Sequence, residues 1–457
     1  MPELTRRRLL AAAAWTAVCG GGLATWLNRR ELLAYLHDDA AEDDGFRVLR
    51  RPFPTEPTRE VSALGFGCGS KLAIRDRDKR FLDEELNTAL MDYAYRHGVN
   101  YFDTAYFYHD GESERFLGRT LKRYPRESIW LADKLPAREV KKPEDAKAIF
   151  EEQLRRCQVE YFDNYLLHTI KDPDEYERVY KRWKVLDYLK DEKARGRIRH
   201  LSISYHGTSE FLKRVLDDYP WESVLILINA FEHRWNPDSL KIAEILAERK
   251  IPIFVMEPLA GGCAANLNAE GRRILSETGK KMTPAEWGFR YVQSFPGVMT
   301  VLSGMSRMNW LKENIRTFSP EGYRPLDAAE RAVYGQAADS YVKNRTIPCT
   351  TCRYCVPCPY GVAIPEIFTW WNAFAGAGRL PAREGPNDSQ ALRREFLASY
   401  SHGVPAGCGP EKCVKCKKCL RACPQWSFKI TDELAKIERT LAEAREDFVS
   451  KGGRAWA

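Results

Sequence analysis

The chain has little net charge outside its first 30 residues. Of a formal charge of +8, those 30 residues contribute +4 through five arginines and one glutamate, which leaves +4 for the other 427. So small an excess over so long a chain excludes the basic surface with which nucleic-acid-binding proteins neutralise phosphates. No unit of about 20–50 residues recurs in the sequence, which excludes architectures built from sequence repeats.

The segment Gly65-Phe66-Gly67-Cys68-Gly69 lacks a glycine three positions after Gly67. A doubly wound nucleotide-binding sheet would need that glycine in its Gly-x-Gly-x-x-Gly turn. The chain of 457 residues is also longer than one hydrophobic core usually supports, so we expect at least two domains.

Short apolar segments alternate with longer helical ones from residue 61 onward. The expected strands are Ser62–Gly69, Asn100–Asp103, Ile129–Leu135, Phe162–His168, Ile198–Tyr205, Val224–Phe231, Ile251–Leu259 and Val298–Gly304. The expected helices include Glu84–Arg96, Pro143–Cys157, Pro173–Arg195 and Ser239–Arg249. Eight strands alternating with helices predict an α/β fold of the (β/α)8, or TIM, barrel type.

The first 30 residues predict a targeting segment. Thr5-Arg6-Arg7-Arg8 precedes an apolar run, Leu9 to Leu27, that is rich in alanine and glycine. Consecutive arginines before such a run are typical of a twin-arginine export signal. The run approaches the ~20 residues that span a bilayer, so a plain membrane anchor is the alternative. We expect an exported protein, periplasmic or tethered to the membrane only through this segment, with a cytoplasmic location as the alternative.

Polar side chains stand at the ends of three successive expected strands. Asp103 ends the second strand, Lys134 lies at the end of the third, and His168 ends the fourth. In a parallel barrel these ends meet at one rim, together with Tyr108, which follows Asp103 by five residues. A tyrosine whose pKa is lowered by a nearby lysine can donate a proton to a carbonyl that receives a hydride. A carboxylate can hold that lysine in place, and a neutral imidazole can orient the substrate oxygen.

Residues 61–320 resemble the aldo-keto reductases. The resemblance rests on Val61–Gly67 (Val-Ser-Ala-Leu-Gly-Phe-Gly), on Phe-Asp-Thr-Ala at 102–105 followed by Tyr108, and on Asp163–His168 (Asp-Asn-Tyr-Leu-Leu-His). It implies Tyr108 as general acid, a small carbonyl or alcohol substrate, and a nicotinamide cofactor, NADP or NAD, extended across the barrel mouth. The positions matching the family's cofactor contacts are Ser204, Asn229, Pro258, Leu259, Ser303, Gly304, Met305, Glu313 and Asn314.

Four positions depart from the family's pattern. Tyr205 stands where many relatives have an asparagine, and Leu227 where they have a glutamine. Met256 replaces a tyrosine that stacks on nicotinamide, while Trp310, with Arg307 nearby, replaces an arginine that binds the 2′-phosphate of NADP. The choice between NADP and NAD therefore stays open. A barrel that has kept its shape in a non-catalytic electron-transfer or interaction subunit is the alternative function.

Eight cysteines form two dense runs toward the C-terminal end. They are Cys349, Cys352, Cys355 and Cys358 in the first run and Cys413, Cys416, Cys419 and Cys423 in the second, with a proline after the last cysteine of each. The second run has the bacterial ferredoxin spacing, in which the cysteine before proline ligates the other cluster. We expect one or two 4Fe–4S clusters that exchange electrons with a redox partner.

The ligand set of the first run stays open. Two residues separate Cys355 from Cys358, where the ferredoxin pattern has three between these cysteines. Cys408 is therefore a possible substitute ligand. Zinc is the alternative metal. Disulfides are a third alternative for an exported protein, although so dense a spacing would strain them.

Helices complete the C-terminal region. Ile364–Ala375 and Ser389–Ser401 are expected between the cysteine runs, and Leu434–Val449 as a charged closing helix. A barrel followed by a cysteine-rich tail resembles an iron–sulfur subgroup of the same family. We therefore divide the chain into a signal or anchor (1–30), a linker (31–60), an aldo-keto reductase barrel (61–325), a small, mainly helical ferredoxin-like domain (340–430) and a C-terminal helix (431–457).

Overall fold

The computed structural model describes residues 45–451, except 70–71, 75–81, 345 and 426–427. Its centre is a closed barrel of eight parallel strands in the order β10-β3-β4-β5-β6-β7-β8-β9. The strands are β3 (Leu64–Gly67), β4 (Tyr101–Asp103), β5 (Trp130–Pro136), β6 (Phe162–Ile170), β7 (Ile198–Tyr205), β8 (Val224–Leu227), β9 (Ile253–Met256) and β10 (Val298–Ser303). The predicted (β/α)8 fold is confirmed.

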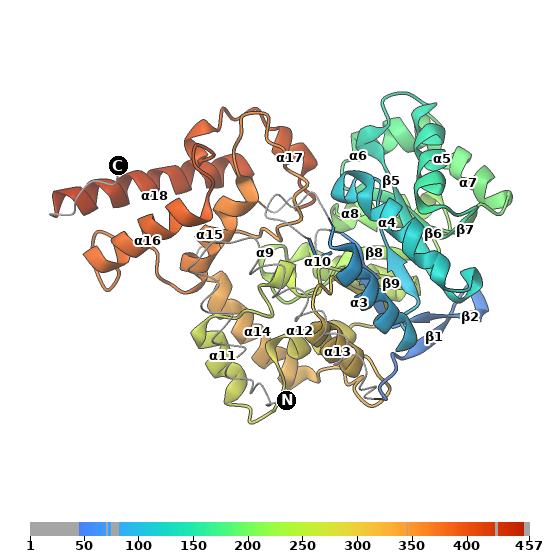
Figure 1. Ribbon diagram of the computed structural model, residues 1–457, viewed down its shortest axis with the longest axis horizontal. Coiled ribbons are helices and arrows are strands. Elements are labelled where there is room, and N and C mark those ends of the chain that lie inside the picture. Colours follow the sequence, from blue (N-terminus) through green and yellow to red (C-terminus); the bar gives the residue numbers. More distant parts are fainter. Residues whose placement is uncertain (1–44, 70–71, 75–81, 345, 426–427, 452–457) are drawn as a thin grey trace, which may run out of the picture.

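Helices surround the barrel (Figure 1). Those that bury apolar faces in the barrel core are α3 (Glu84–Arg96), α4 (Glu112–Thr120), α5 (Asp145–Cys157), α6 (Pro173–Tyr176), α7 (Val185–Ala194), α8 (Ser209–Asp218), α10 (Asp238–Glu248), α12 (Pro284–Gln293) and α13 (Met308–Thr317). A separate apolar cluster, to which α12 also contributes, joins α9 (Glu232–Trp235), α11 (Ala269–Ser276) and α14 (Ala328–Val342). Pro284 begins α12, because a proline needs no backbone N–H partner in the first turn.

The single helix expected over Pro173–Arg195 is interrupted. A π-helical turn over Glu177–Arg182 follows α6, and α7 begins only at Val185. Lys184 has a φ of +57°, in the left-handed region, and a residue in that conformation cannot continue a right-handed helix. The single-helix prediction is therefore wrong here, because the backbone reversal at Lys184 left no signal in the sequence.

A hairpin that the sequence did not reveal closes the N-terminal end of the barrel. β1 (Arg50–Phe53) pairs antiparallel with β2 (Glu56–Ser62), within the stretch expected to be a linker. Phe53 is fully buried, with its ring centroid 5.0 Å from that of Trp130 and 4.6 Å from that of His200. Its side chain therefore fills the lower end of the barrel core.

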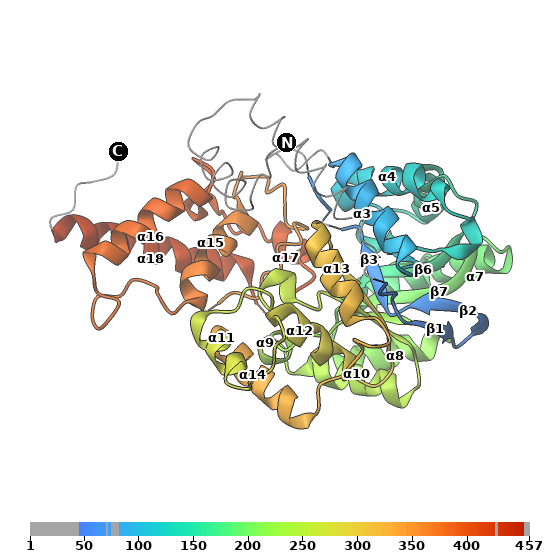
Figure 2. The same ribbon diagram turned by 60° about the horizontal axis from the view of Figure 1, so that its bottom comes forward.

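A second, helical unit extends from the barrel on the side away from the hairpin (Figures 1 and 2). It consists of α15 (Ile364–Gly376), α16 (Gln390–Gly403), α17 (Lys418–Ala422) and α18 (Ile430–Ser450). Its core includes Trp371 on α15, Phe396 on α16 and Leu434 on α18. The three long helices expected from the sequence are all present, and α18 begins four residues earlier than predicted.

No helix in the described ranges is long and apolar enough to cross a membrane. The predicted targeting run, Leu9 to Leu27, lies outside those ranges.

The buried hairpin residue provides a test of the fold. Phe53→Ala should destabilise the barrel by about 3–5 kcal/mol, because the cavity left between Trp130 and His200 cannot collapse fully. For a barrel of this size we expect a midpoint of thermal unfolding lowered by roughly 6–15 °C. Leu240→Ala is the matched control, because Leu240 is 36% exposed on α10. Equal melting temperatures for the two variants would contradict a structural role for the hairpin.

Candidate active site and cysteine cavities

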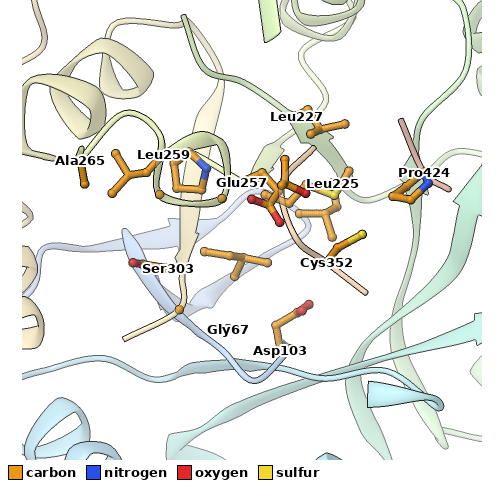
Figure 3. A pocket seen from close by; sticks show the side chains of 18 of the residues that line it. Gly67, Asp103, Leu225, Leu227, Glu257, Leu259, Ala265, Ser303, Cys352 and Pro424 are labelled. Atoms are coloured by element: carbon orange, nitrogen blue, oxygen red, sulfur yellow. The ribbon is translucent and has the colours of Figure 1, made fainter. Parts of the chain in front are cut away.

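A cavity of about 480 Å³ opens at the carboxyl ends of the barrel strands. Four polar side chains line it from the loops and ends of β4, β5 and β6, and they are Asp103, Tyr108, Lys134 and His168. Figure 3 shows Asp103 and Ser303 near the barrel, with Cys352 and Pro424 entering from the cysteine-rich segments. The four residues predicted from successive strand ends therefore do converge, and the wall opposite them belongs partly to the second unit.

A buried ion pair links the ends of β4 and β5. Lys134 Nζ donates to Asp103 Oδ1 at 2.6 Å and to the Thr104 carbonyl at 2.6 Å. The two side chains are 1% and 5% exposed. Burial raises the pKa of Asp103, while the neighbouring ammonium acts in the opposite direction. The pair gives the floor of the cavity a fixed positive charge and a fixed acceptor.

Tyr108 lies at the start of the loop that follows β4, with its ring beside this ion pair. The Lys134 Nζ atom is 5.0 Å from the ring centroid. The sequence predicted a pKa lowered by Lys134, and that expectation is wrong for this structure. Burial raises the pKa of Tyr108 well above its usual value, and Tyr354 raises it further. Tyr108 is therefore a protonated, neutral phenol.

His168 is held face-on by an aromatic neighbour. Its ring stacks on Phe107 at a centroid distance of 5.0 Å and an angle of 4°. The Arg138 guanidinium lies 3.9 Å from the centroid of the Phe107 ring. Burial lowers the pKa of His168 well below its usual value, and the charges of Lys134 and Arg138 lower it further. The imidazole is therefore neutral and can donate one hydrogen bond.

A fifth side chain reaches this group from the first cysteine run. The Tyr354 hydroxyl donates to Tyr108 Oη at 3.2 Å and lies 3.3 Å from His168 Nε2. Its ring meets Phe107 edge-on at 4.8 Å. Sequence reasoning missed Tyr354, because nothing in the cysteine spacing indicates that this loop enters the barrel mouth.

Seven of the nine residues matched to cofactor contacts line the cavity. They are Ser204, Pro258, Leu259, Ser303, Gly304, Glu313 and Asn314. Asn229 does not line it, because its amide donates to the Glu257 carbonyl at 2.9 Å and its Oδ1 accepts from the Glu232 N–H at 2.6 Å. Met305 does not line it either, since it is 1% exposed in the hydrophobic core. Both positions support the cavity wall from behind.

The positions that depart from the family's pattern also differ in where they lie. Leu227, Met256 and Trp310 line the cavity, which gives it an apolar wall where relatives have amide, phenol and guanidinium groups. Tyr205 points away, and its hydroxyl donates to the Thr208 carbonyl at 2.6 Å. The Arg307 guanidinium lies 4.9 Å from the Trp310 ring centroid, at the outer rim.

The eight cysteines divide between two smaller cavities in a crosswise manner. One is lined by Cys349, Cys352, Cys355 and Cys423, three cysteines of the first run and the last of the second. The other is lined by Cys413, Cys416 and Cys419 of the second run with Cys358, and Cys355 borders it as well. Cys408 lines neither cavity. The shortened spacing therefore still carries Cys358 to the second cavity.

The two runs share an unusual backbone pattern. Thr351 and Arg353 have positive φ angles in the first run, as do Lys415 and Lys417 at the equivalent positions of the second. Alternating left- and right-handed residues turn successive N–H groups to one side, which creates a concavity for an anion such as an iron–sulfur cluster. The backbone N–H groups of Thr351 and Tyr354 face the sulfurs of Cys349 and Cys352, respectively. The chain's own residues therefore fit a negatively charged cluster in each loop.

All eight cysteines lie within the described residues and are free thiols there, with no disulfide among them.

Each cysteine run has one close contact with the barrel rim, the second run through Lys171 and the first through Gly261. Lys171, after β6, donates to the carbonyls of Arg421, at 2.9 Å, and of Cys423. Gly261, after β9, has a φ of +68°, and a Cβ there would lie 2.5 Å from the Thr350 carbonyl oxygen. Only glycine allows this approach, so the barrel loop and the first cysteine run are closely fitted.

Comparisons with known proteins agree with both parts of the structure. The sequence profile of the Aldo/keto reductase family matches residues 63–330, and that of a 4Fe-4S dicluster domain matches residues 348–428. Probable aldo-keto reductase 1 of Glycine max is 29% identical over 213 residues, covering 44% of this chain and 57% of that protein. The NADH-specific methylglyoxal reductase of Escherichia coli (strain K12) is 31% identical over 201 residues, covering 40% of this chain and 59% of that protein. The chain thus spans less than two thirds of the length of either relative.

A solved structure shows the same barrel. A thermostable aldo-keto reductase, crystallised with the inhibitor epalrestat, aligns with a TM-score of 0.52 and 20% identity. The alignment covers 63% of this chain and 99% of that one. At this level of identity the likeness establishes the shared fold.

The crosswise division of the cysteines can be tested by iron analysis. Cys423→Ala and Cys358→Ala should each lose about one of two clusters, because each removes one ligand from a different set of four. Iron and acid-labile sulfide in anaerobically purified protein should therefore fall to roughly half in either variant and nearly to zero in the double variant. Cys408→Ala is the control and should keep full iron. A loss of iron in that control with full iron in Cys358→Ala would refute the division.

Proposed function

The chain belongs to the aldo/keto reductase family, and from this membership we propose that its barrel binds a nicotinamide cofactor and interconverts a carbonyl and an alcohol. The proposal rests on one observation above all. The side chains of Tyr108, Lys134 and His168 face a single cavity of about 480 Å³, a size suited to a small ligand. The relative named NADH-specific methylglyoxal reductase supports a nicotinamide cofactor and a small carbonyl substrate.

The cavity offers suitable surroundings for the nicotinamide cofactor. Leu227 and Met256 supply an apolar wall for its ring, and Ser204 supplies a hydroxyl. Near the outer rim, Asn314 Nδ2 donates to Ser303 Oγ at 3.1 Å, which holds the loop after β10 in place. When bound, the cofactor would supply or accept the hydride. Arg307, whose guanidinium lies 4.9 Å from the Trp310 ring centroid, would pair with a phosphate of the cofactor.

The proton of the reaction would come from the chain itself. Tyr108 is buried and neutral, so it can donate its proton to the oxygen of a carbonyl that gains a hydride. Lys134, held by Asp103, places a positive charge beside the phenolate that this transfer leaves. Neutral His168 can donate a hydrogen bond to the same substrate oxygen and orient it. Reprotonation of Tyr108 would complete the cycle.

We further propose that the crosswise cysteine sets hold two 4Fe–4S clusters, which would serve one-electron transfer. The second loop supports a protein partner as the other participant. Cys416 is exposed there, and exposed cations surround it, namely Lys412, Lys415, Lys417, Lys418 and Arg421. Such a face would favour an acidic electron carrier, because opposite charges accelerate encounter.

A non-catalytic role remains the second candidate function, and one observation favours it. The Tyr354 hydroxyl already lies within hydrogen-bond distance of Tyr108 Oη and His168 Nε2, the two atoms that a substrate oxygen would approach. A barrel used only to carry the clusters could tolerate such a contact permanently. Turnover of a carbonyl that depends on Tyr108 would exclude this second function.

The first test removes the proposed acid. Tyr108→Phe should lower kcat/KM for a small carbonyl such as methylglyoxal at least ~100-fold, because the ring stays while its transferable proton is lost. Nucleotide affinity, measured by fluorescence titration, should change less than about twofold. Tyr219→Phe, remote from the cavity after α8, is the matched control. Retained turnover in Tyr108→Phe would remove this residue from the mechanism.

For location, we propose export through a twin-arginine signal at Arg6 and Arg7. The double change Arg6→Lys with Arg7→Lys keeps the positive charge that orients a membrane anchor, but not the guanidinium geometry. We expect the variant to stay in the cytoplasm, folded and loaded with iron, while the parent reaches the far side of the membrane. Cell fractionation, with protease treatment of spheroplasts, distinguishes the two. Equal export of both forms would contradict the twin-arginine route.

A further inference from the structure

We infer that Tyr354 is a specificity-determining gate, which occupies the substrate-oxygen position and must leave before a carbonyl group can bind. This inference rests on the proposed function and deepens it. Tyr354 belongs to the first cysteine run, between Cys352 and Cys355. It therefore joins the cluster-binding unit to the groups that would perform the chemistry.

The hydroxyl of Tyr354 stands where the substrate oxygen is required. It lies 3.2 Å from Tyr108 Oη and 3.3 Å from His168 Nε2, the two groups proposed to protonate and orient that oxygen. A neutral imidazole has one N–H, and a phenol has one O–H. While His168 donates to Tyr354 it cannot donate to a carbonyl, and the Tyr354 hydroxyl stands 3.2 Å from Tyr108 Oη, so substrate and Tyr354 compete for the His168 hydrogen bond and for the same position beside Tyr108.

The ring of Tyr354 packs against side chains of the barrel. It meets Phe107 edge-on at 4.8 Å, and the Arg138 guanidinium lies 5.4 Å from its centroid. The ring also lies 6.0 Å from that of His168 and 6.3 Å from that of Tyr108, centroid to centroid. Tyr354 lines both the barrel cavity and the cavity of the second cysteine run, so a movement of its side chain would free the oxygen position.

The backbone of Tyr354 is held more firmly than its side chain. Its N–H faces the sulfur of Cys352, which also lines the cavity. Arg353, directly before it, has a φ of +68° and pairs with Glu366 at 2.6 Å. The first cysteine loop therefore fixes the backbone position from which the Tyr354 side chain extends. That position decides how easily a substrate can displace the side chain. Small, strongly hydrogen-bonding carbonyl compounds should compete best.

The test uses acetate as the probe, because a carboxylate accepts hydrogen bonds from Tyr108 and His168 without being turned over. Calorimetric titration would compare the iron-loaded parent with Tyr354→Phe and Tyr354→Ala. Removing the hydroxyl alone should tighten acetate binding roughly 3–10-fold, the equivalent of one net hydrogen bond. Tyr354→Ala also removes the ring and should bind acetate at least as tightly as Tyr354→Phe. Tyr219→Phe is the control and should match the parent.

Each outcome bears on the gate separately from the reaction. Unchanged or weaker acetate binding in Tyr354→Phe would overturn the gate, whether or not the parent reduces a carbonyl. If Tyr354→Ala lost its iron, Tyr354→Phe would still decide, because its ring preserves the packing against Phe107. Tighter acetate binding without carbonyl turnover in any form would uphold the gate and refute the proposed reaction. Where turnover exists, kcat/KM for methylglyoxal should rise by the same factor as acetate affinity.

Discussion

The buried ion pair between Lys134 and Asp103 is the interaction on which the functional end of the barrel depends. The 2.6 Å contact joins side chains that are at most 5% exposed, so neither charge has water to compensate for a lost partner. Breaking such a pair costs about 3–5 kcal/mol. The same contact fixes the ammonium 5.0 Å from the Tyr108 ring centroid. One interaction thus stabilises the ends of two strands and positions the charge that the proposed proton transfer requires.

The barrel and its four polar residues could be predicted because parallel strands impose a simple rule. Residues at successive strand ends must meet at one rim, so Asp103, Lys134 and His168 converge whatever lies between them. The hairpin at residues 50–62 could not be predicted in this way. Its outward-facing charged residues resemble those of a solvated linker, and only the tertiary burial of Phe53 distinguishes it. The direction of the Tyr108 pKa shift was also missed, because it depends on burial by a distant segment.

The cysteine region shows where spacing alone becomes insufficient. The recurrence of cysteine at every third residue indicated two cluster-binding loops. It could not decide whether Cys358 or Cys408 is the fourth cluster ligand. The structure separates them because positive φ angles at Thr351 and Arg353 turn the first loop as Lys415 and Lys417 turn the second. Such angles in residues other than glycine leave little trace in sequence. Tyr354 was missed for a related reason, since its partners are about 190–250 positions away along the chain.

The crosswise sharing of cysteines has a consequence for how the protein matures. The set that contains Cys358 is complete only when synthesis has passed Cys419, and the other set only when it has passed Cys423, whereas the last barrel strand ends at Ser303. Since domains generally fold as units, N-terminal ones first, a nascent chain would hold a finished barrel while both inorganic centres still await assembly. In that interval the Tyr108 phenol would face an uncovered rim. Tyr354 reaches that rim only with the first cysteine run, so the age of a molecule, and not only its sequence, would decide how open its catalytic mouth is.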